Sequence, residues 1–199
     1  MRELSYAAKT NYRFVLNETV AIAELIYRGA SPQEIRRKVI DEDLFQLRTV
    51  ASRKRLLSNI LRRLQEVDRA YIKLLVTGNT DTRRLTVLFL ILREDRLLRE
   101  LIGEVLLDKL KRFIHTIEPT DLQTFFETKR SQSPTILTWS ESTYQKVTSS
   151  CVLTLVSAGL LQPIEPRGTY EIRSIPLPAA LRQQLLADGQ EVYLTLMLN

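Results

Sequence analysis

The sequence of 199 residues has few of the residues that support covalent or metal-based chemistry. It contains one cysteine, Cys151, and one histidine, His115. A single cysteine excludes an internal disulfide framework and is typical of a reducing cytoplasm. Two such residues cannot complete a zinc site. A Cys–His catalytic pair is disfavoured because Cys151 falls on the apolar side of an expected helix. We therefore expect no metal and no catalytic residues.

Glycine and long apolar runs are also scarce. The six glycines stand singly, so the chain has neither a phosphate-cradling loop nor a dinucleotide fingerprint, and we expect no cofactor and no small-molecule substrate. The longest apolar run, Val87 to Leu92, is too short to cross a bilayer, and the opening "MRELSYAAK" lacks the apolar region of a signal peptide. These absences predict a non-enzymatic, cytoplasmic protein without membrane contact.

Basic residues are concentrated in the first two fifths of the chain. Residues 1–80 hold 15 Lys and Arg against 9 Asp and Glu, whereas residues 81–199 hold 14 of each. The whole net charge of +6 therefore lies in the amino-terminal part. Such asymmetry predicts a surface that binds a polyanion. Nucleic acid is favoured, and an acidic protein partner is the alternative.

Hydrophobic periodicity predicts a mainly helical protein. Apolar residues recur at helical spacing over 16–27. The letters "SPQE" then supply three helix-start signals, with Ser31 as N-cap, Pro32 at the first helical position and Glu34 closing a capping box. This second helix is expected to run to about Ile40.

A long third helix is predicted from near Thr49 to Val76, ended by Gly78. Its apolar stripe lies opposite Arg55, Arg62, Arg69 and Lys73, whose spacing suits a phosphate backbone. A solvated face on a long helix is the simpler explanation, but further cations crowd nearby and favour binding. The predicted DNA contacts of this part are Arg48, Arg53, Lys54, Arg55, Arg62, Arg63 and Arg69.

Further helices are expected at 81–92, 94–115 and 120–130. Pro119 marks a plausible boundary, so we predict a helical domain over 1–117 and a second domain over 118–199. In the first domain, two helices joined by "RGASP" precede a third that opens with "SRKR", which is a helix-turn-helix-like order.

The stretch "WSESTYQKV" predicts a recognition helix over 140–158. With Ser140 as N-cap, Trp139 and Tyr144 occupy the two positions of a hydrophobic staple. The buried stripe is expected to hold Tyr144, Val147, Cys151, Leu155 and Ala158. The opposite side has no acid, and its hydroxyls, amide and lysine suit base edges and phosphates. The predicted contacts are Ser140, Ser142, Thr143, Gln145 and Lys146.

A short β-hairpin is predicted to follow this helix. Gly159 is the expected C-cap, and "LQPI" and "TYEI" form two extended runs around "EPRG", with Arg167 at the tip as a further DNA contact. Helix, recognition helix and hairpin is the order of a winged helix. Many winged helices bind only proteins, and residues 120–199 carry six basic side chains against seven acidic ones. DNA and protein therefore both stay open as partners of this part.

The chain also resembles a known family in several stretches. These are "NETVAIAELIYRGASPQEIRRKVIDEDLFQ", "RRL" in the long helix, "FF" at 125–126 and, most specifically, "WSESTYQKV…LVSAGLL". Over roughly residues 12–165 they are similar to the BrxA family, small core proteins of the BREX bacteriophage-exclusion systems. The resemblance implies an all-helical, non-enzymatic, double-stranded DNA-binding protein that acts beside a methyltransferase, an ATPase and other BREX components.

Two alternatives accompany this resemblance. The amino-terminal helices of the family are similar to the antitermination protein NusB, which implies RNA binding by a NusB-like helical bundle. The basic face could instead dock an acidic BREX subunit, which would make the chain a protein–protein adaptor.

Overall fold

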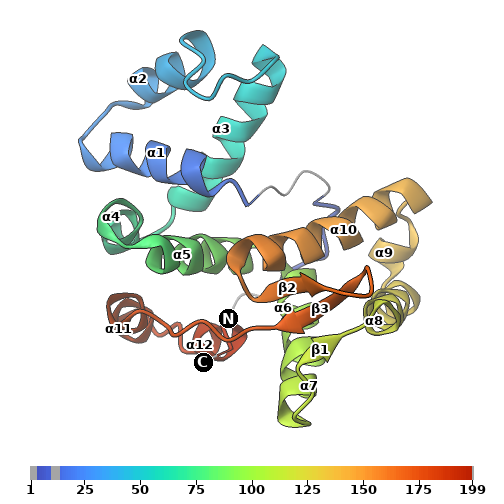
Figure 1. Cartoon of the computed structure of the whole chain (residues 1–199). Coiled ribbons are helices and arrows are strands. Elements are labelled where there is room, and N and C mark those ends of the chain that lie inside the picture. The colour runs from blue at the N-terminus through green and yellow to red at the C-terminus, as the bar shows by residue number, and fades with distance from the viewer. Residues whose placement is uncertain (1–3, 10–13, 199) are drawn as a thin grey trace.

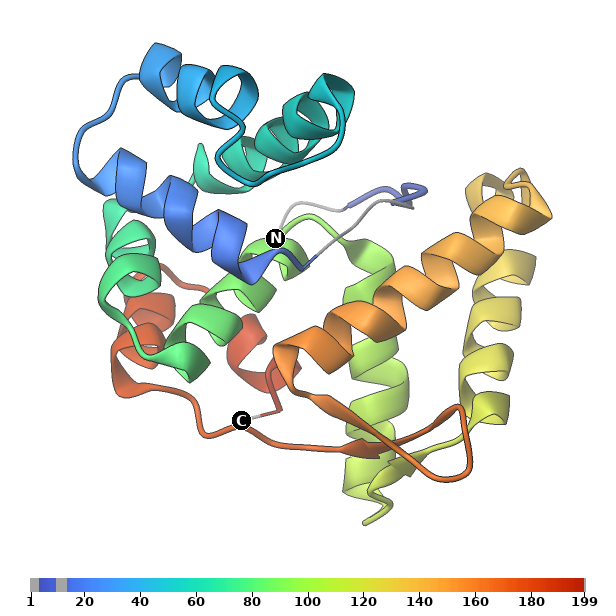
Figure 2. The same ribbon diagram turned by 45° about the horizontal axis from the view of Figure 1, so that its top comes forward.

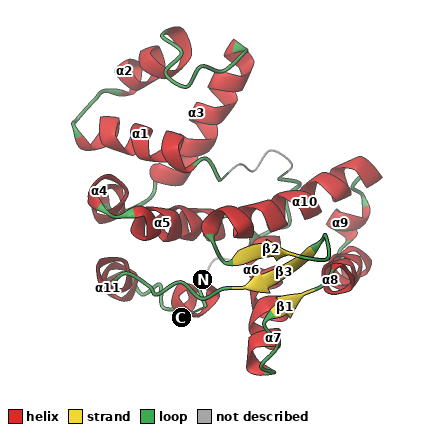
Figure 3. Cartoon of the chain, in the orientation of Figure 1, coloured by secondary structure: helices red, strands yellow, loops and turns green. Residues whose placement is uncertain are grey.

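The computed structural model describes residues 4–9 and 14–198, which form helices and one small antiparallel sheet (Figures 1 and 3). This confirms the predicted mainly helical fold class with a short hairpin. The helices are α1 (Leu16–Tyr27), α2 (Pro32–Arg36), α3 (Val50–Leu64), α4 (Arg69–Thr77), α5 (Thr80–Leu92), α6 (Arg96–Leu101), α7 (Leu107–Lys111), α8 (Pro119–Gln132), α9 (Pro134–Leu137), α10 (Glu141–Ala158), α11 (Ala179–Ala187) and α12 (Val192–Leu196). The π-helical turns are η1 (Arg37–Asp41) and η2 (Ile102–Leu106), and the strands are β1 (Thr116–Ile117), β2 (Leu161–Ile164) and β3 (Thr169–Ile172).

Helix α1 has the predicted bounds, and α2 begins where its capping signals place it. The Ser31 hydroxyl accepts a hydrogen bond from the Glu34 N–H at 3.2 Å, and the Glu34 carboxylate accepts from the Ser31 N–H at 2.7 Å. This reciprocal capping box fixes the start of α2. The helix continues through η1 to Asp41, one residue beyond the predicted end.

The predicted third helix is wrong as a single element, because the chain forms two helices there. The first, α3, ends at Leu64, and α4 begins at Arg69, where the Asp68 carboxylate caps the new helix by accepting from the Ala70 N–H at 2.7 Å. A short acidic side chain at an N-cap favours a fresh start over continuation. The two helices point in different directions (Figures 1 and 2). Each buries apolar residues, namely Leu57, Ile60 and Leu64 on α3 and Tyr71 and Leu75 on α4.

The predicted helix over 94–115 also ends early. It spans α6, η2 and α7 and stops at Lys111, after which the chain turns into β1. Helix α12 lies near the carboxyl end of the chain. Its Tyr193 packs edge-on against Phe89 of α5, with ring centroids 5.1 Å apart.

Helix α5 lies at the centre of the molecule. Leu85 and every side chain from Val87 to Leu92 are buried, so this helix is apolar nearly all round, as expected of a core helix. It packs against α1, α4 and α10. The buried residues form one connected cluster from Phe14 to Leu198. Contacts therefore cross residue 117 at several places, and the division into 1–117 and 118–199 stays a prediction.

The sheet joins the predicted hairpin to a third strand. Strands β2 and β3 pair antiparallel, with Leu161 opposite Ile172, which confirms the hairpin. The additional strand β1 pairs with β3, with Ile117 opposite Tyr170, so the sheet order is β1-β3-β2. Helix α10 lies along one side of this sheet and packs on β2 (Figure 1).

An ionic cluster joins the amino-terminal segment to α6 and α8. The Glu100 carboxylate accepts from the Tyr6 hydroxyl at 2.7 Å and from Arg96 Nε at 2.7 Å, and it pairs with Lys129 Nζ at 2.9 Å. Burial of this carboxylate opposes its ionisation, but the hydrogen bonds from Arg96, Lys129 and Tyr6 outweigh that penalty and lower the pKa of Glu100. The cluster therefore holds the carboxylate ionised at neutral pH.

Candidate nucleic-acid interface

The amino-terminal cations gather around a cleft of about 280 Å³ between α1, the loop before α3, and α3 itself. Arg48 of the loop and Arg55 of α3 are exposed at this cleft, whereas Arg63 is only 3% exposed in its wall. Guanidinium, hydroxyl and amide donors in one concave surface suit phosphate oxygens. The residues that line the cleft are Val15, Glu18, Leu47, Arg48, Ser52, Arg55, Leu56, Asn59 and Arg63. Glu18 is the one acid of this lining.

Arg53 braces the loop that carries Arg48. Its guanidinium donates to the Leu47 carbonyl at 3.1 Å and to the Ile40 carbonyl at 3.0 Å, and it pairs with the Asp43 carboxylate at 2.7 Å. The side chain is 18% exposed. Arg53 therefore faces the protein and positions Arg48. Its contact with DNA stays a prediction, and this geometry does not favour it.

The remaining predicted cations of this part do not form one ridge. Because the helix breaks after Leu64, Arg69 lies on α4, with its guanidinium 5.9 Å from the centre of the Tyr27 ring. Arg62 pairs with the Glu94 carboxylate at 3.0 Å. Lys54 is exposed on α3 near the cleft. The expected continuous basic side of a single helix is therefore wrong, and the structure brings together only the subset around the cleft.

A second candidate surface begins at the first turn of α10. Ser140 is the N-cap, and its hydroxyl accepts from the Thr143 N–H at 3.3 Å. The same hydroxyl donates to Thr143 Oγ1 at 2.9 Å and lies 3.2 Å from the hydroxyl of Ser142. The predicted buried stripe of α10 is confirmed in full, and Gln145 and Lys146 are exposed on the other side. Ser140 and Thr143 thus serve the cap, while Gln145 and Lys146 face solvent.

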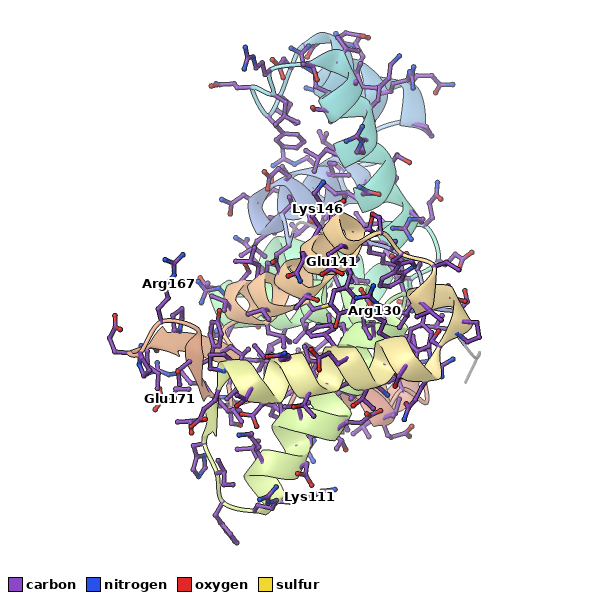
Figure 4. The ribbon with its side chains drawn as sticks, turned by 90° about the vertical axis from the view of Figure 1, so that its right-hand side faces the viewer. Lys111, Arg130, Glu141, Lys146, Arg167 and Glu171 are labelled. Atoms are coloured by element: carbon purple, nitrogen blue, oxygen red, sulfur yellow. The ribbon has the colours of Figure 1, made fainter. Side chains whose placement is uncertain are left out.

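Glu141 binds two side chains at the start of this surface. Its carboxylate accepts from Gln145 Nε2 at 2.9 Å and from an Arg130 guanidinium nitrogen at 2.9 Å, and these hydrogen bonds lower the pKa of Glu141. Figure 4 shows Arg130 of α8 and Glu141 of α10 facing each other. The Arg130 guanidinium also lies 4.9 Å from the centre of the Tyr144 ring. A base contact by Gln145 would therefore require exchange of its hydrogen bond to Glu141.

Trp139 and Tyr144 pack as core-facing residues at this end of α10. Tyr144 is buried, with its ring edge-on to Phe126 at 6.4 Å, and Trp139 is half-buried against the core. Their direct contact as a staple stays a prediction.

The hairpin tip supplies the last predicted cation. Arg167 is exposed between β2 and β3, and in Figure 4 it projects at the edge of the molecule, away from Lys146. Within the described residues, no ion pair joins Lys146 or Arg167 to a carboxylate. The neighbouring Gly168 has φ +93°, a conformation that favours glycine in a tight turn.

The described part of the chain offers neither a metal site nor a membrane span. It contains no group of three or more His, Cys, Asp or Glu residues that could hold a metal ion. None of its helices has the length and apolarity that crossing a membrane requires.

The fold and these surfaces define a class of small, mainly helical proteins with a three-stranded sheet and exposed cations on two separate parts. The sequence model of the BrxA family matches residues 6–189, and the chain belongs to this family, as its sequence motifs indicated.

The relatives are similar over most of their length. A BREX protein BrxA from Bacillus cereus (strain H3081.97) is 27% identical over 182 residues, which covers 92% of this chain and 90% of the relative. A BREX protein BrxA from Escherichia coli O9:H4 (strain HS) is 20% identical over 180 residues, with 90% and 83% covered. The crystal structure of an uncharacterized protein from Magnetospirillum magneticum has a TM-score of 0.80 at 19% identity and covers 96% of this chain and 97% of its own, so the two share a fold.

Proposed function

We propose that this chain is a non-enzymatic, cytoplasmic, double-stranded DNA-binding protein of a BREX phage-defence system, where it acts with components such as a methyltransferase and an ATPase. Membership of the BrxA family supports the place in phage defence, since both curated relatives are named as BREX proteins. The observation that carries DNA binding is the cleft at which Arg48 and Arg55 are exposed.

The amino-terminal surface is proposed to bind phosphates without reading sequence. Arg48, Lys54 and Arg55 project from one end of α3 and the loop before it, and Arg69 is a separate exposed cation at the start of α4. Phosphate contacts of this kind position a duplex and dominate its affinity. We leave Arg53 and Arg63 out of the contact set because both guanidinium groups lie within the protein. We leave out Arg62 because Glu94 neutralises it.

The carboxyl-terminal part is proposed to act as a winged helix. Helices α8 and α10 lie between β1 and β2 in the chain, and β2 and β3 form a hairpin beside α10, which supports this interpretation. In such an arrangement α10 enters the major groove by its first turns, where Gln145 and Lys146 are exposed. The tip residue Arg167 would bind the neighbouring phosphates.

The salt dependence of binding tests this proposal. Six exposed cations are proposed to contact phosphates, namely Arg48, Lys54, Arg55, Arg69, Lys146 and Arg167. The logarithm of affinity should then fall with the logarithm of salt concentration with a slope of about −5. The measurement is a titration of labelled duplex at several salt concentrations, and a slope near zero would overturn the phosphate-contact model.

A role as an adaptor is the second candidate for the carboxyl-terminal part. Leu137 of α9 and Leu153 of α10 are each 62% exposed, and residues 81–199 have no net charge. Exposed apolar side chains on a neutral surface favour a protein partner. Capture of purified BREX components by the whole chain, with and without Leu153→Glu, would identify this role. A NusB-like RNA-binding role is distinguished by competition between duplex DNA and RNA.

A further inference from the structure

Phe113 is exposed in a backbone conformation that disfavours it. Its side chain is 88% exposed, the largest value for a large hydrophobic residue among those the structure describes. Its φ is +59°, in the left-handed region, where a bulky side chain is a genuine outlier. A residue that is both strained and unburied contributes nothing evident to the fold, so a binding role is the more direct explanation.

The strain arises from the end of α7. The Ile114 N–H donates to the Lys109 carbonyl at 2.9 Å, and the Phe113 N–H donates to the Leu110 carbonyl at 3.0 Å. These two bonds form a Schellman cap, in which the residue at the position of Phe113 is usually glycine. Glycine would satisfy this cap without strain. The cap therefore does not explain why a phenylalanine stands there, and instead it makes the ring project from the helix end.

Polar and basic residues adjoin Phe113 in the chain. Lys111, Arg112 and His115 are all exposed. Lys109 on the same helix pairs with Asp121 at 2.5 Å. Arg112 lies 3.6 Å from the Asp108 carboxylate, but this pair is longer than that of Arg62 with Glu94 and both of its side chains are more than half exposed, so a phosphate can replace the carboxylate. Lys111 has no carboxylate partner within the described residues, and Figure 4 places it at the end of the molecule beyond α8. The tip of α7 thus presents one aromatic ring beside two cations, Lys111 and Arg112.

We propose that Phe113 is a DNA-contacting wedge that stacks on a base of the duplex while Lys111 and Arg112 bind the adjacent phosphates. This inference rests on the proposed DNA-binding function and adds a contact on α7 that neither basic surface includes. Phenylalanine inserted at a base step is an established way in which proteins grip and kink DNA, and cations beside it match the phosphates on each side of the step. A protein partner fits less well, because protein interfaces bury a cluster of apolar residues and the ring here stands alone among charges.

The test compares Phe113→Ala, Phe113→Gly and Phe113→Tyr with the parent chain on the same duplex. Alanine and glycine remove the ring and should weaken binding by roughly 5- to 150-fold, the range of one base–aromatic stack. Tyrosine keeps a ring and should retain most of the affinity. The matched control is Leu186→Ala, which shortens another exposed apolar side chain, on α11, and should change nothing.

Insertion is measured separately from affinity, by fluorescence of 2-aminopurine placed at successive steps of the duplex. The parent should raise this fluorescence at one or more steps because the ring unstacks the base, and Phe113→Gly should not. Glycine should also leave the melting temperature equal or higher, since it relieves the left-handed strain. Failure of the parent to bind duplex would overturn the proposed function and this inference together. Equal affinity and equal fluorescence for parent and Phe113→Gly would overturn the wedge alone, as would a loss of affinity in Phe113→Ala without any fluorescence signal from the parent.

Discussion

The cleft lined by Arg48 and Arg55 allows a quantitative prediction. We expect the double substitution Arg48→Ala, Arg55→Ala to weaken duplex binding far more at low salt than at high salt. Both side chains are exposed, and the structure records no ion pair for either within the described residues, so their removal should change the unfolding free energy by no more than about 0.5 kcal/mol. Any loss of affinity can then be assigned to lost contacts with DNA.

The size of the effect follows from counterion release. Each phosphate contact on B-DNA contributes about 0.9 to the slope of log affinity against log salt, taken from a reference near 1 M. One contact is therefore worth about 8-fold in affinity at about 0.1 M salt and about 3-fold at about 0.3 M. Loss of both arginines should cost about 60-fold at the lower salt and about 9-fold at the higher.

Fluorescence anisotropy of a labelled duplex at the two salt concentrations measures this ratio. The matched control is Arg173→Ala, Arg182→Ala, which lowers the net charge by the same amount through exposed arginines of the carboxyl-terminal part. The control separates contact from long-range attraction. Phosphate binding at the cleft would be refuted if the double substitution lowered duplex affinity by the same factor at both salt concentrations. It would also be refuted if the control variant lost as much affinity as the Arg48→Ala, Arg55→Ala variant.

Three further predictions concern the core, α10 and the ionic cluster. Ile60→Asp buries an unpaired charge at a fully buried position and should destabilise the protein by about 3–5 kcal/mol, seen as loss of a cooperative thermal transition. Gln145→Ala with Lys146→Ala should leave the melting temperature nearly unchanged but weaken duplex binding by about 1–3 kcal/mol, and unchanged affinity would assign this face to a protein partner. The lowered pKa of Glu100 means that its stabilisation is complete above the ordinary value of 4.5 and is lost as pH falls below it. The melting temperature of Glu100→Gln should accordingly fall less between pH 5 and pH 3 than that of the parent. An equal fall for both proteins would contradict a stabilising role of the Glu100 carboxylate in the cluster.

Much of the local structure could be predicted from sequence. The capping box at Ser31 and Glu34, the bounds of α1 and the buried side of α10 are written in residues one to four positions apart, so their signals do not depend on the rest of the fold. The turn with Arg167 at its tip was found for the same reason. These signals place Arg55, Lys146 and Arg167 on the elements where the structure has them. Arg69 is the exception, because the predicted helix breaks after Leu64.

The features that sequence reasoning missed depend on contacts between distant residues. The break between α3 and α4 leaves the apolar spacing almost intact, so periodicity alone could not show it, although Asp68 was a visible N-cap candidate. Strand β1 has only two residues and exists because β3 lies beside it. Arg53 turns inward because the Ile40 carbonyl of η1 and two acceptors of the following loop, on Asp43 and Leu47, surround it, and no local pattern reports that.

Arg130 was missed as well, since its bond to Glu141 spans two helices. The exposure of Phe113 has one local signal, a phenylalanine that directly follows Lys111 and Arg112 near the expected end of a helix.

Competition between nucleic acids tests the central claim most directly. The purified chain is bound to labelled duplex DNA and challenged with equal nucleotide concentrations of unlabelled duplex, single-stranded DNA of the same sequence, and the corresponding RNA hairpin. We expect unlabelled duplex DNA to displace the labelled duplex at the lowest concentration, and we expect the Arg48→Ala, Arg55→Ala variant to bind the labelled duplex much more weakly than the parent. Stronger displacement by RNA, or no binding of the duplex at physiological salt, would contradict a double-stranded DNA-binding function.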